Sequence, residues 1–166
     1  TATTGATALV TSATYLPCGP ATEIQYGNGT TKSSSFDARY RIETNALTGP
    51  SGLIASYDYD HDDAGNITAI RDLIDPGYDR AFGYDDINRL TTANSGAKLW
   101  GPGSYQYDAM GNMLSLTLGT HRTATFSYAG TTPKLWQVVE NGPPSSVSYD
   151  AVGNEIAVGS MTSGYS

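Results

Sequence analysis

Basic residues and long apolar runs are scarce in this chain of 166 residues. Nine Lys and Arg stand against sixteen Asp and Glu, which gives a net charge of −7. A protein that binds the phosphate backbone of DNA or RNA needs a basic surface, so this charge argues against a nucleic-acid partner. No apolar run approaches the length of a membrane span, and the sequence has no basic helix that would lie on a membrane surface.

Cysteine occurs once, at Cys18, which excludes an internal disulfide framework. Cys18 lies in LPCGP with no base beside it, and it is interpreted as a small inert residue because reactive thiols need an electropositive setting. Helix signals are also lacking, since no window combines an apolar period of 3.6 with helix caps. The chain contains instead twelve Tyr, nineteen Gly and many Thr and Ser, a composition that favours strands and tight turns.

One phrase recurs along the chain. YQYDAMGNML (105–114) and VSYDAVGNEI (147–156) share the core Tyr-Asp-x-x-Gly-Asn, whose four named positions we call the aromatic, aspartate, glycine and asparagine slots. Other copies keep the spacing but change a slot. Asn88 and Tyr40 replace Gly, and His61 replaces Tyr. The aromatic slots follow one another at steps of 21 to 25 residues. The residues assigned to the repeat are Tyr15, Gly19, Phe36, Asp37, His61, Asp62, Gly65, Asn66, Tyr84, Asp85, Asn88, Tyr107, Asp108, Gly111, Asn112, Tyr128, Tyr149, Asp150, Gly153 and Asn154.

The acidic stretch DYDHDDAGN (58–66) suggests a calcium loop at first sight. A loop of the EF-hand type needs Gly at its sixth position and Glu at its twelfth. Counted from Asp58, those positions hold Asp63 and Ala69. The stretch is therefore interpreted as a solvated turn of the repeat, and weak cation binding at residues 58–63 stays open as an alternative. No metal site and no cofactor site is predicted, because the glycines lie in hairpin turns rather than before a helix.

The repeat describes a tight turn between two strands. Asp at the start and Gly three residues later are typical of a type I turn that ends in a bulge, where Gly supplies a positive φ. Asn88 tolerates that conformation, whereas Tyr40 does not suit it, so a different turn is expected in its copy. After one turn, LSLTL is expected to place Leu114, Leu116 and Leu118 on one face.

A second set of turns lies between the repeats, and turns then fall roughly every 10 to 12 residues. The sequence predicts an all-β antiparallel meander of hairpins, stacked into a curved or spiralling sheet. The expected organisation is a lead-in of small residues (1–12), a repeat region (13–158) and a tail (159–166). The second turns are expected at residues 26–30, 48–52, 75–78, 94–96, 118–121 and 141–144.

These phrases resemble the YD repeats of bacterial Rhs proteins, of the C components of Tc toxins and of teneurins, over nearly the whole chain. The resemblance implies a β-sheet that spirals into a hollow shell, which encloses a toxic domain until delivery. It implies that this chain is a structural shell segment and not an enzyme, secreted or on a cell surface, with neighbouring repeats, self-association and an enclosed toxin domain as partners. DPGY (75–78) lies mid-chain, so the autocleavage role of the family's Asp-Pro-x-Gly signature is not carried over to it.

Few residues are candidates for chemistry or ligand binding. His61 is interpreted as a variant wall residue and His121 as an exposed turn residue, because neither has the spacing of a metal pair. Trp100 and Trp136, with the many tyrosines, could form a sugar-stacking face, and the alternative is that aromatic pairs hold the sheet together. A cell-surface adhesion or carbohydrate-binding module is therefore the second functional hypothesis, and an enzyme that uses an acid pair near residues 58–63 is the least supported.

Overall fold

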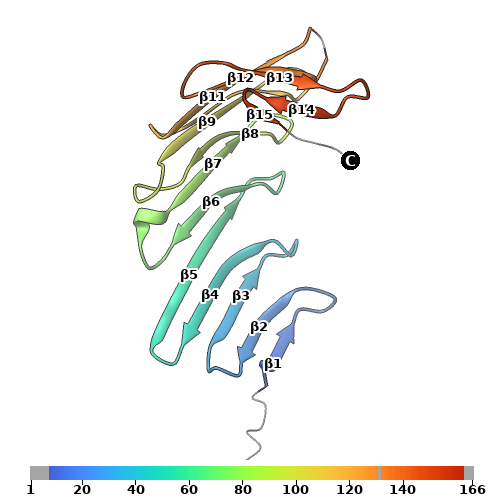
Figure 1. Cartoon of the computed structure of the whole chain (residues 1–166). Helices are drawn as coiled ribbons and strands as arrows, with labels where there is room; N and C mark the ends of the chain where they lie inside the picture. The colour runs from blue at the N-terminus through green and yellow to red at the C-terminus, as the bar shows by residue number, and fades with distance from the viewer. Residues whose placement is uncertain (1–7, 131, 163–166) are drawn as a thin grey trace, which may run out of the picture. The chain divides into compact units, whose positions relative to one another are not determined.

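The computed structural model describes residues 8–130 and 132–162, so the outer parts of the predicted lead-in and tail lie outside the described residues. The chain divides into two compact units, residues 1–82 and 83–166, each of which is described by itself (Figure 1). Within each unit the strands pair antiparallel with the strands next to them in the chain. The predicted all-β fold, an antiparallel meander of hairpins, is confirmed.

The strands are short and joined by turns. The first unit holds β1 (Val10–Tyr15), β2 (Ala21–Tyr26), β3 (Thr31–Phe36), β4 (Ile42–Gly49), β5 (Gly52–His61), β6 (Ile67–Asp72) and the short 3₁₀-helix η1 (Pro76–Tyr78). β7 (Arg80–Tyr84) contains the boundary between the units. The second unit holds β8 (Leu90–Asn94), β9 (Pro102–Tyr107), β10 (Met113–Leu118), β11 (Arg122–Tyr128), β12 (Leu135–Glu140), β13 (Ser145–Tyr149), β14 (Glu155–Val158) and β15 (Met161–Thr162).

The turns alternate between two kinds along the chain. The repeat turns join β1 to β2, β3 to β4, and so on, while the second set of turns joins β2 to β3, β4 to β5, and so on. The six turns of the second set from β2–β3 to β12–β13 fall where the sequence predicted them, whereas the seventh, between β14 and β15, was not predicted. In DPGY the turn is the 3₁₀-helix η1, where the Asp75 carboxylate accepts a hydrogen bond from the backbone N–H of Gly77 at 3.0 Å.

A bulge follows each repeat turn for which the strand register is known. Tyr107 lies opposite Met113, but Gln106 lies opposite Ser115, so Leu114 is an extra residue without a cross-strand partner. Leu116 and Leu118 follow the predicted alternation, whereas Leu114 leaves it and is 39% exposed. The same register shift makes extra residues of Thr22, Glu43, Thr68, Trp136 and Ile156.

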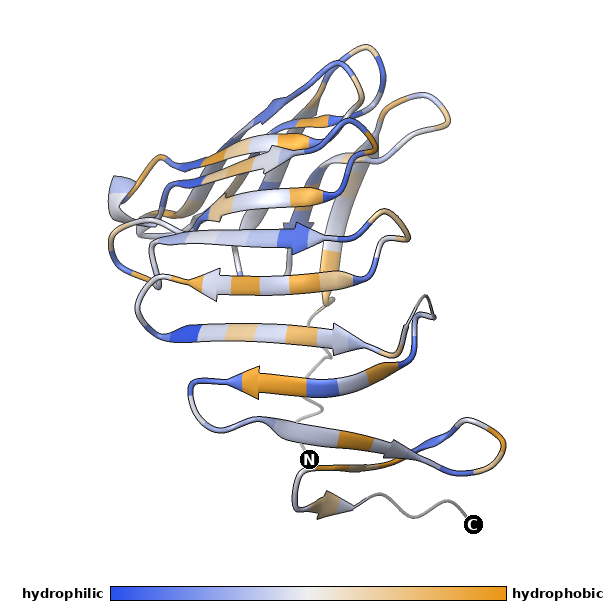
Figure 2. Ribbon diagram, turned by 90° about the horizontal axis from the view of Figure 1, so that it is seen from above, coloured by the Kyte–Doolittle hydropathy of each residue, from blue (hydrophilic) through white to orange (hydrophobic). Residues whose placement is uncertain are grey.

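Each unit is one sheet layer without a central core. Within a unit the strands contact only the strands beside them. Among the described apolar residues, only Ala93, Ala124 and Val147 are less than a tenth exposed. Figure 2 shows hydrophobic and hydrophilic residues alternating along several strands, as a sheet with two different faces requires. Stability must therefore come from bonds between neighbouring hairpins rather than from a buried interior.

The repeat turn depends on a residue with positive φ, and Gly111 tests this dependence in isolation. Gly111 has φ +90°, and a Cβ added there would meet no atom within 4 Å. We expect Gly111→Ala to lower the free energy of unfolding by about 1–2 kcal/mol, because only backbone strain is added. Urea denaturation measures the change. Gly142→Ala is the matched control, since Gly142 has no positive φ and its added Cβ would make one ordinary contact at 3.7 Å. Equal losses in the two variants would contradict the explanation.

Candidate functional site: the row of capped turns

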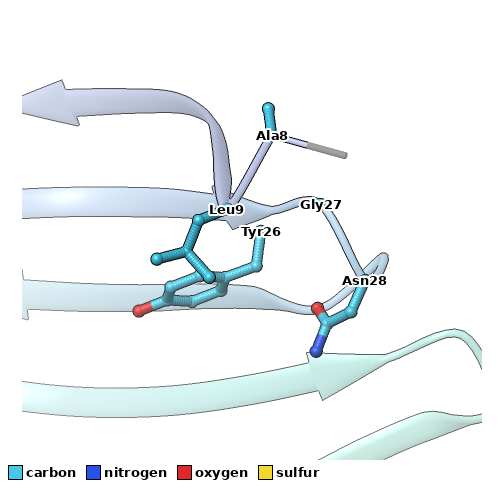
Figure 3. A pocket seen from close by; sticks show the side chains of 5 residues that line it. All are labelled: Ala8, Leu9, Tyr26, Gly27 and Asn28. Carbon is cyan, nitrogen blue, oxygen red and sulfur yellow. The ribbon is translucent and has the colours of Figure 1, made fainter. Parts of the chain in front are cut away.

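Two hollows on the described surface lack the carboxylates, imidazoles and thiols that serve in acid–base catalysis. One lies beside β1 and β2, where Figure 3 shows Leu9 next to the ring of Tyr26. Its lining holds no carboxylate, imidazole or thiol, and the side chain of Asn28 accepts hydrogen bonds from Thr30 at 2.7 and 3.0 Å. A second hollow is lined by Thr123, Ala124, Thr125, Val139, Asn141 and Gly142.

The four aspartates of the acidic stretch at residues 58–63 have three different environments. Asp58 and Asp60 both form ion pairs with Arg71 on the next strand. Asp62 accepts hydrogen bonds from its own turn, and Asp63 is exposed. No group of three or more His, Cys, Asp or Glu that could hold a metal ion occurs in the described part of the chain. The carboxylates thus do not converge on one point.

The carboxylate in the aspartate slot closes the repeat turn. In the turn at Asp108, Oδ1 accepts the backbone N–H groups of Met110 and Asn112, both at 2.8 Å. Oδ2 accepts the side-chain amide of Asn112 at 2.8 Å. The backbone of Asp108 also donates to the Asn112 carbonyl and accepts from Gly111, which is the hydrogen-bond pattern of a three-residue hairpin loop with a bulge. Asp37, Asp62, Asp85 and Asp150 accept hydrogen bonds from their turns in nearly the same way.

The asparagine slot takes either Asn or Arg with the same local result. Asn66, Asn112 and Asn154 donate their side-chain amides to the aspartate of their own turn at 2.8–2.9 Å. In two other copies, Arg41 and Arg89 donate Nε to the same carboxylate oxygen at 2.7 Å. Both side chains therefore cap the carboxylate, but Arg retains its Nη nitrogens for a second contact.

Tyr40 corrects the prediction of a different turn in its copy. Its φ is +63°, and its N–H donates to Asp37 as the glycine slot does elsewhere. A contact with the preceding repeat accounts for this conformation. The Tyr40 hydroxyl donates to the carbonyl of Pro17 at 2.9 Å, and its ring occupies the place where a Cβ on Gly19 would lie. A contact between repeats thus outweighs the local preference of Tyr.

The two copies without Asp also form a turn, but the residue with positive φ or the length of the turn differs. In the first copy the backbone N–H of Leu16 donates to the carbonyl of Pro20, and Cys18 rather than Gly19 has the positive φ, at 54°. The copy at Tyr128 has an extra residue, so that the backbone N–H of Ala129 donates to the carbonyl of Lys134. The cysteine interpreted as inert is therefore an exposed turn residue.

The aromatic slots share one face of the sheet in each unit. In the first unit the strand register places Tyr15, Phe36 and His61 on the same side. In the second unit it does so for Tyr107, Tyr128 and Tyr149. We call this side the aromatic face. Two of its tyrosines also join successive repeats, because the hydroxyls donate to backbone carbonyls one repeat earlier: Tyr128 to Met113 and Tyr149 to Leu135, both at 2.8 Å.

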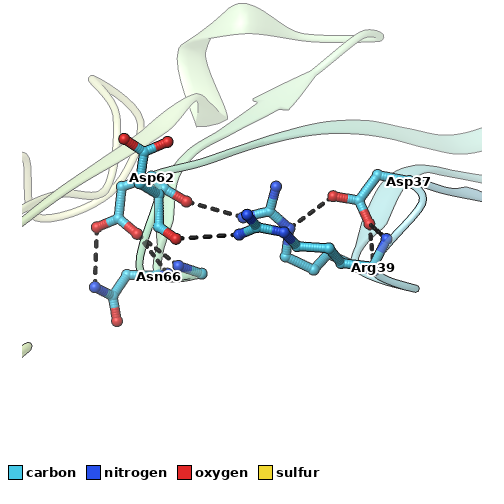
Figure 4. Close-up of polar contacts among 7 residues, drawn as sticks. Asp37, Arg39, Asp62 and Asn66 are labelled. Atoms are coloured by element: carbon cyan, nitrogen blue, oxygen red, sulfur yellow. Dashed lines mark hydrogen bonds and ion pairs between the residues drawn. The ribbon is translucent and has the colours of Figure 1, made fainter.

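Basic residues in the asparagine slot reach the next repeat. Arg41 Nη1 donates to the backbone carbonyl of Asp62 at 2.8 Å, and Arg39 donates to that of Asp63 at 3.2 Å (Figure 4). Arg89 likewise donates to the carbonyl of Asp108 at 2.8 Å and lies 4.9 Å from the centre of the ring of Tyr107.

The third basic residue in this position, Lys134, lies with Nζ 4.5 Å from the ring centre of Tyr149. From the second copy onward, basic and Asn residues alternate in the slot: Arg41, Asn66, Arg89, Asn112, Lys134 and Asn154. Each basic residue thus binds a following repeat whose own slot holds Asn. Sequence reasoning listed only the Asn members, although the fixed spacing from the aspartate slot would have identified Arg41 and Arg89.

The remaining candidate residues lie apart from one another. Trp100 packs against Gly103 at the start of β9, whereas Trp136 is the extra residue of a bulge beside a repeat turn and is 46% exposed. The two tryptophans occupy opposite ends of the hairpins. His61 is half-buried in its aromatic slot, and His121 is exposed in a turn.

The capping bonds hold the turn carboxylates in their charged form. The pKa of Asp108 lies below its usual value of 3.8, chiefly because the side chain of Asn112 donates to it. The same cause, hydrogen bonds from the turn, lowers the pKa of Asp37, Asp62, Asp85 and Asp150. Burial instead raises the pKa of the Tyr128 hydroxyl.

Comparison with known proteins places the fold. No family model matches the sequence, and no curated protein is significantly similar to it. Among solved structures, a Tc holotoxin pore of Photorhabdus luminescens matches 92% of this chain with a TM-score of 0.67 and 15% identity. TcdB2-TccC3 without its hypervariable C-terminal region matches 94% with a TM-score of 0.66 and 14% identity. The chain spans about a tenth of those chains, 10% in both cases. The resemblance found in the sequence is thereby confirmed at the level of the fold.

The lowered pKa values predict a loss of stability in acid. Because these carboxyls have lower pKa values in the folded chain than the usual 3.8, their stabilisation is present above about pH 4. It is lost as the pH falls below 3.8 through the folded-state values. We expect Asp108→Asn to unfold at lower urea concentration at pH 7 and to lose less stability than the parent between pH 7 and pH 3. Asp86→Asn changes an exposed neighbour of a capping aspartate. It should leave unchanged both the urea concentration of unfolding at pH 7 and the loss of stability between pH 7 and pH 3. An unaltered pH dependence in Asp108→Asn would refute the capping role.

Arg89→Asn separates the local cap from the bond to the next repeat. Asn keeps the capping amide, as in the turn at Asp108, but cannot reach the Asp108 carbonyl or the Tyr107 ring. We expect a loss of about 1 kcal/mol in the free energy of unfolding. A double-mutant cycle with Tyr107→Leu should give a coupling of about 0.5 kcal/mol between the two residues. Additive losses would show that the ring contact contributes nothing.

Proposed function

We propose that this chain is a segment of the wall of a YD-repeat shell, and that the shell encloses or delivers a toxin domain lying outside the chain. The main supporting observation is the single-layer architecture of each unit, in which a hairpin contacts only its neighbours, through strand pairing and through bonds between capped turns. Such a sheet extends by adding further hairpins without changing those already present. A wall needs this property, since its length is set by the number of repeats.

The likeness to solved toxin structures supports the same role. The chains that share this fold belong to structures named as a Tc holotoxin pore and as TcdB2-TccC3. By analogy, we place the chain in a secreted or cell-surface assembly, with neighbouring YD repeats as its immediate partners and a toxin domain as the enclosed partner. Among the described residues, no helix is long and apolar enough to cross a membrane.

The role is structural rather than catalytic in this proposal. The Asp residues of the repeat are engaged in closing turns, and the hollows beside β1 and β11 offer no pair of acid and base. The tyrosines of the aromatic face contact neighbouring repeats through their hydroxyls and rings. These groups are thus used to hold one hairpin to the next.

The test is made on the native protein from its source. We expect an intact mass well above the 17.5 kDa of this chain, with more YD turns and a segment without them. In limited proteolysis, that segment should resist cleavage until the repeat region is unfolded by urea, and then be cut at once. A native protein of about this mass, or a repeat-free segment cut as fast in the native as in the unfolded state, would contradict the enclosing role.

A further inference from the structure

Two cations lie on the aromatic face of the first unit. Lys32 on β3 is paired with Leu47, which is in turn paired with Ala55, two residues before Tyr57 on β5. Arg80 on β7 is paired with Ile70, which is paired with Tyr59. Because residues two apart on a strand share a face, both cations point to the side that carries Tyr57.

Neither cation has a carboxylate partner in the described chain, in contrast to Arg41 and Arg71, which are ion-paired. The guanidinium of Arg80 lies 6.0 Å from the ring centre of Tyr57. Its Nε is enclosed and has no hydrogen-bond acceptor. The carboxylate of Asp72 lies on the same face, but its Oδ1 accepts the backbone N–H groups of Ile74 and Asp75. Two positive charges are therefore left without a negative partner.

Lys32 is part of a shallow hollow on this face. The lining consists of Tyr26, Lys32, Asn45, Leu47, Ala55 and Tyr57, which combines two rings, an amide and the ammonium group. Tyr57 is thus shared, since it lines the hollow and faces Arg80 on its other side. The opposite face of the same unit carries Glu23, Asp58 and Asp60. The positive charges of these strands are consequently gathered on the aromatic face, except for Arg71, which is neutralised by its aspartates.

The spacing of the two cations sets the size of a ligand that contacts both. β3 and β7 are four strand steps apart in the first unit, which corresponds to about 19 Å across the strands. The pairings also place Lys32 level with Ala55 and Arg80 level with Tyr59, about 13 Å apart along β5, so the two backbone positions are about 23 Å apart. A single small anion is too short to reach both, whereas an extended peptide advances about 3.3 Å per residue and covers the distance with about seven residues. A nucleic acid needs a basic surface with many cations along its backbone, and the two unpaired cations of this face do not supply one.

We infer that the aromatic face of the first unit binds an extended acidic peptide, with Lys32 and Arg80 receiving carboxylates near its two ends and Tyr57, on β5 between them, packing against its middle. Charge complementarity carries the choice of ligand, since this face presents two unpaired cations and aromatic rings. The inference goes beyond the proposed wall function and does not require a closed shell. It applies to any assembly that presents this face to an acidic segment.

The test uses the whole chain and a heptapeptide with Glu at both ends and a neutral dye, measured by fluorescence anisotropy. We expect saturable binding that weakens with added salt, and no saturable binding of the same peptide with Gln at both ends. Lys32→Gln and Arg80→Gln should each weaken binding about three- to fivefold, as expected for a partly exposed charge pair. Arg39→Gln is the matched control, because it removes the same charge from a turn tip of the same unit and should leave binding unchanged.

Each alternative has its own result. Equal binding of the Glu and Gln peptides, or equal losses in Arg39→Gln and Lys32→Gln, would overturn the inference. A dimer in light scattering that dissociates in Lys32→Gln would overturn it in favour of a second copy of this chain. If Arg80→Gln fails to fold by circular dichroism, Lys32→Gln decides alone, and unchanged affinity in that variant would count against the site.

Discussion

A β-sheet one layer thick cannot hide its side chains in an interior, and the other features of this chain follow from that constraint. Only three apolar side chains of the described residues are less than a tenth exposed. The free energy that a globular domain gains from its core must come here from bonds within and between hairpins. The aspartate slot supplies the first of these bonds by fixing the repeat turns that contain Asp, and the aromatic and basic residues beside it supply the second by joining the turns.

The interchange of Asn and Arg illustrates how one slot serves both purposes. Asn donates its side-chain amide to the turn carboxylate. Arg donates Nε to the same carboxylate and also donates Nη1 to a backbone carbonyl of the next turn. Tyr40 makes the same point from the glycine slot, because its contact with Pro17 and Gly19 compensates for an unfavourable backbone conformation. Tyr40, Arg41 and Arg89 are thus departures from the consensus at which two hairpins are joined.

The sequence was sufficient for the fold class, the position of the turns and the backbone conformation at Gly65, Asn88, Gly111 and Gly153, because these depend on local preferences repeated many times. It was misleading at Tyr40, where the deciding contact comes from a residue about 20 positions away. It also did not reveal the bulges, since an extra residue such as Leu114 or Trp136 fits the alternating pattern of a regular strand equally well. The contacts of Arg41, Arg89 and Lys134 with the next repeat could not be predicted from the sequence, because a basic residue in a turn is normally interpreted as a solvated charge.

The restriction of contacts to adjacent strands also determines how such a sheet responds to force. Tension applied across the strands loads the hydrogen bonds of one hairpin at a time, so the outermost hairpin peels away first and the others remain folded. Tension along the strands loads a whole ladder of bonds at once and meets much greater resistance. The sheet is therefore mechanically anisotropic within each unit, with a weak direction that runs along the row of turns. The arginines that join one turn to the next strengthen the sheet in that weak direction, because their hydrogen bonds connect successive hairpins.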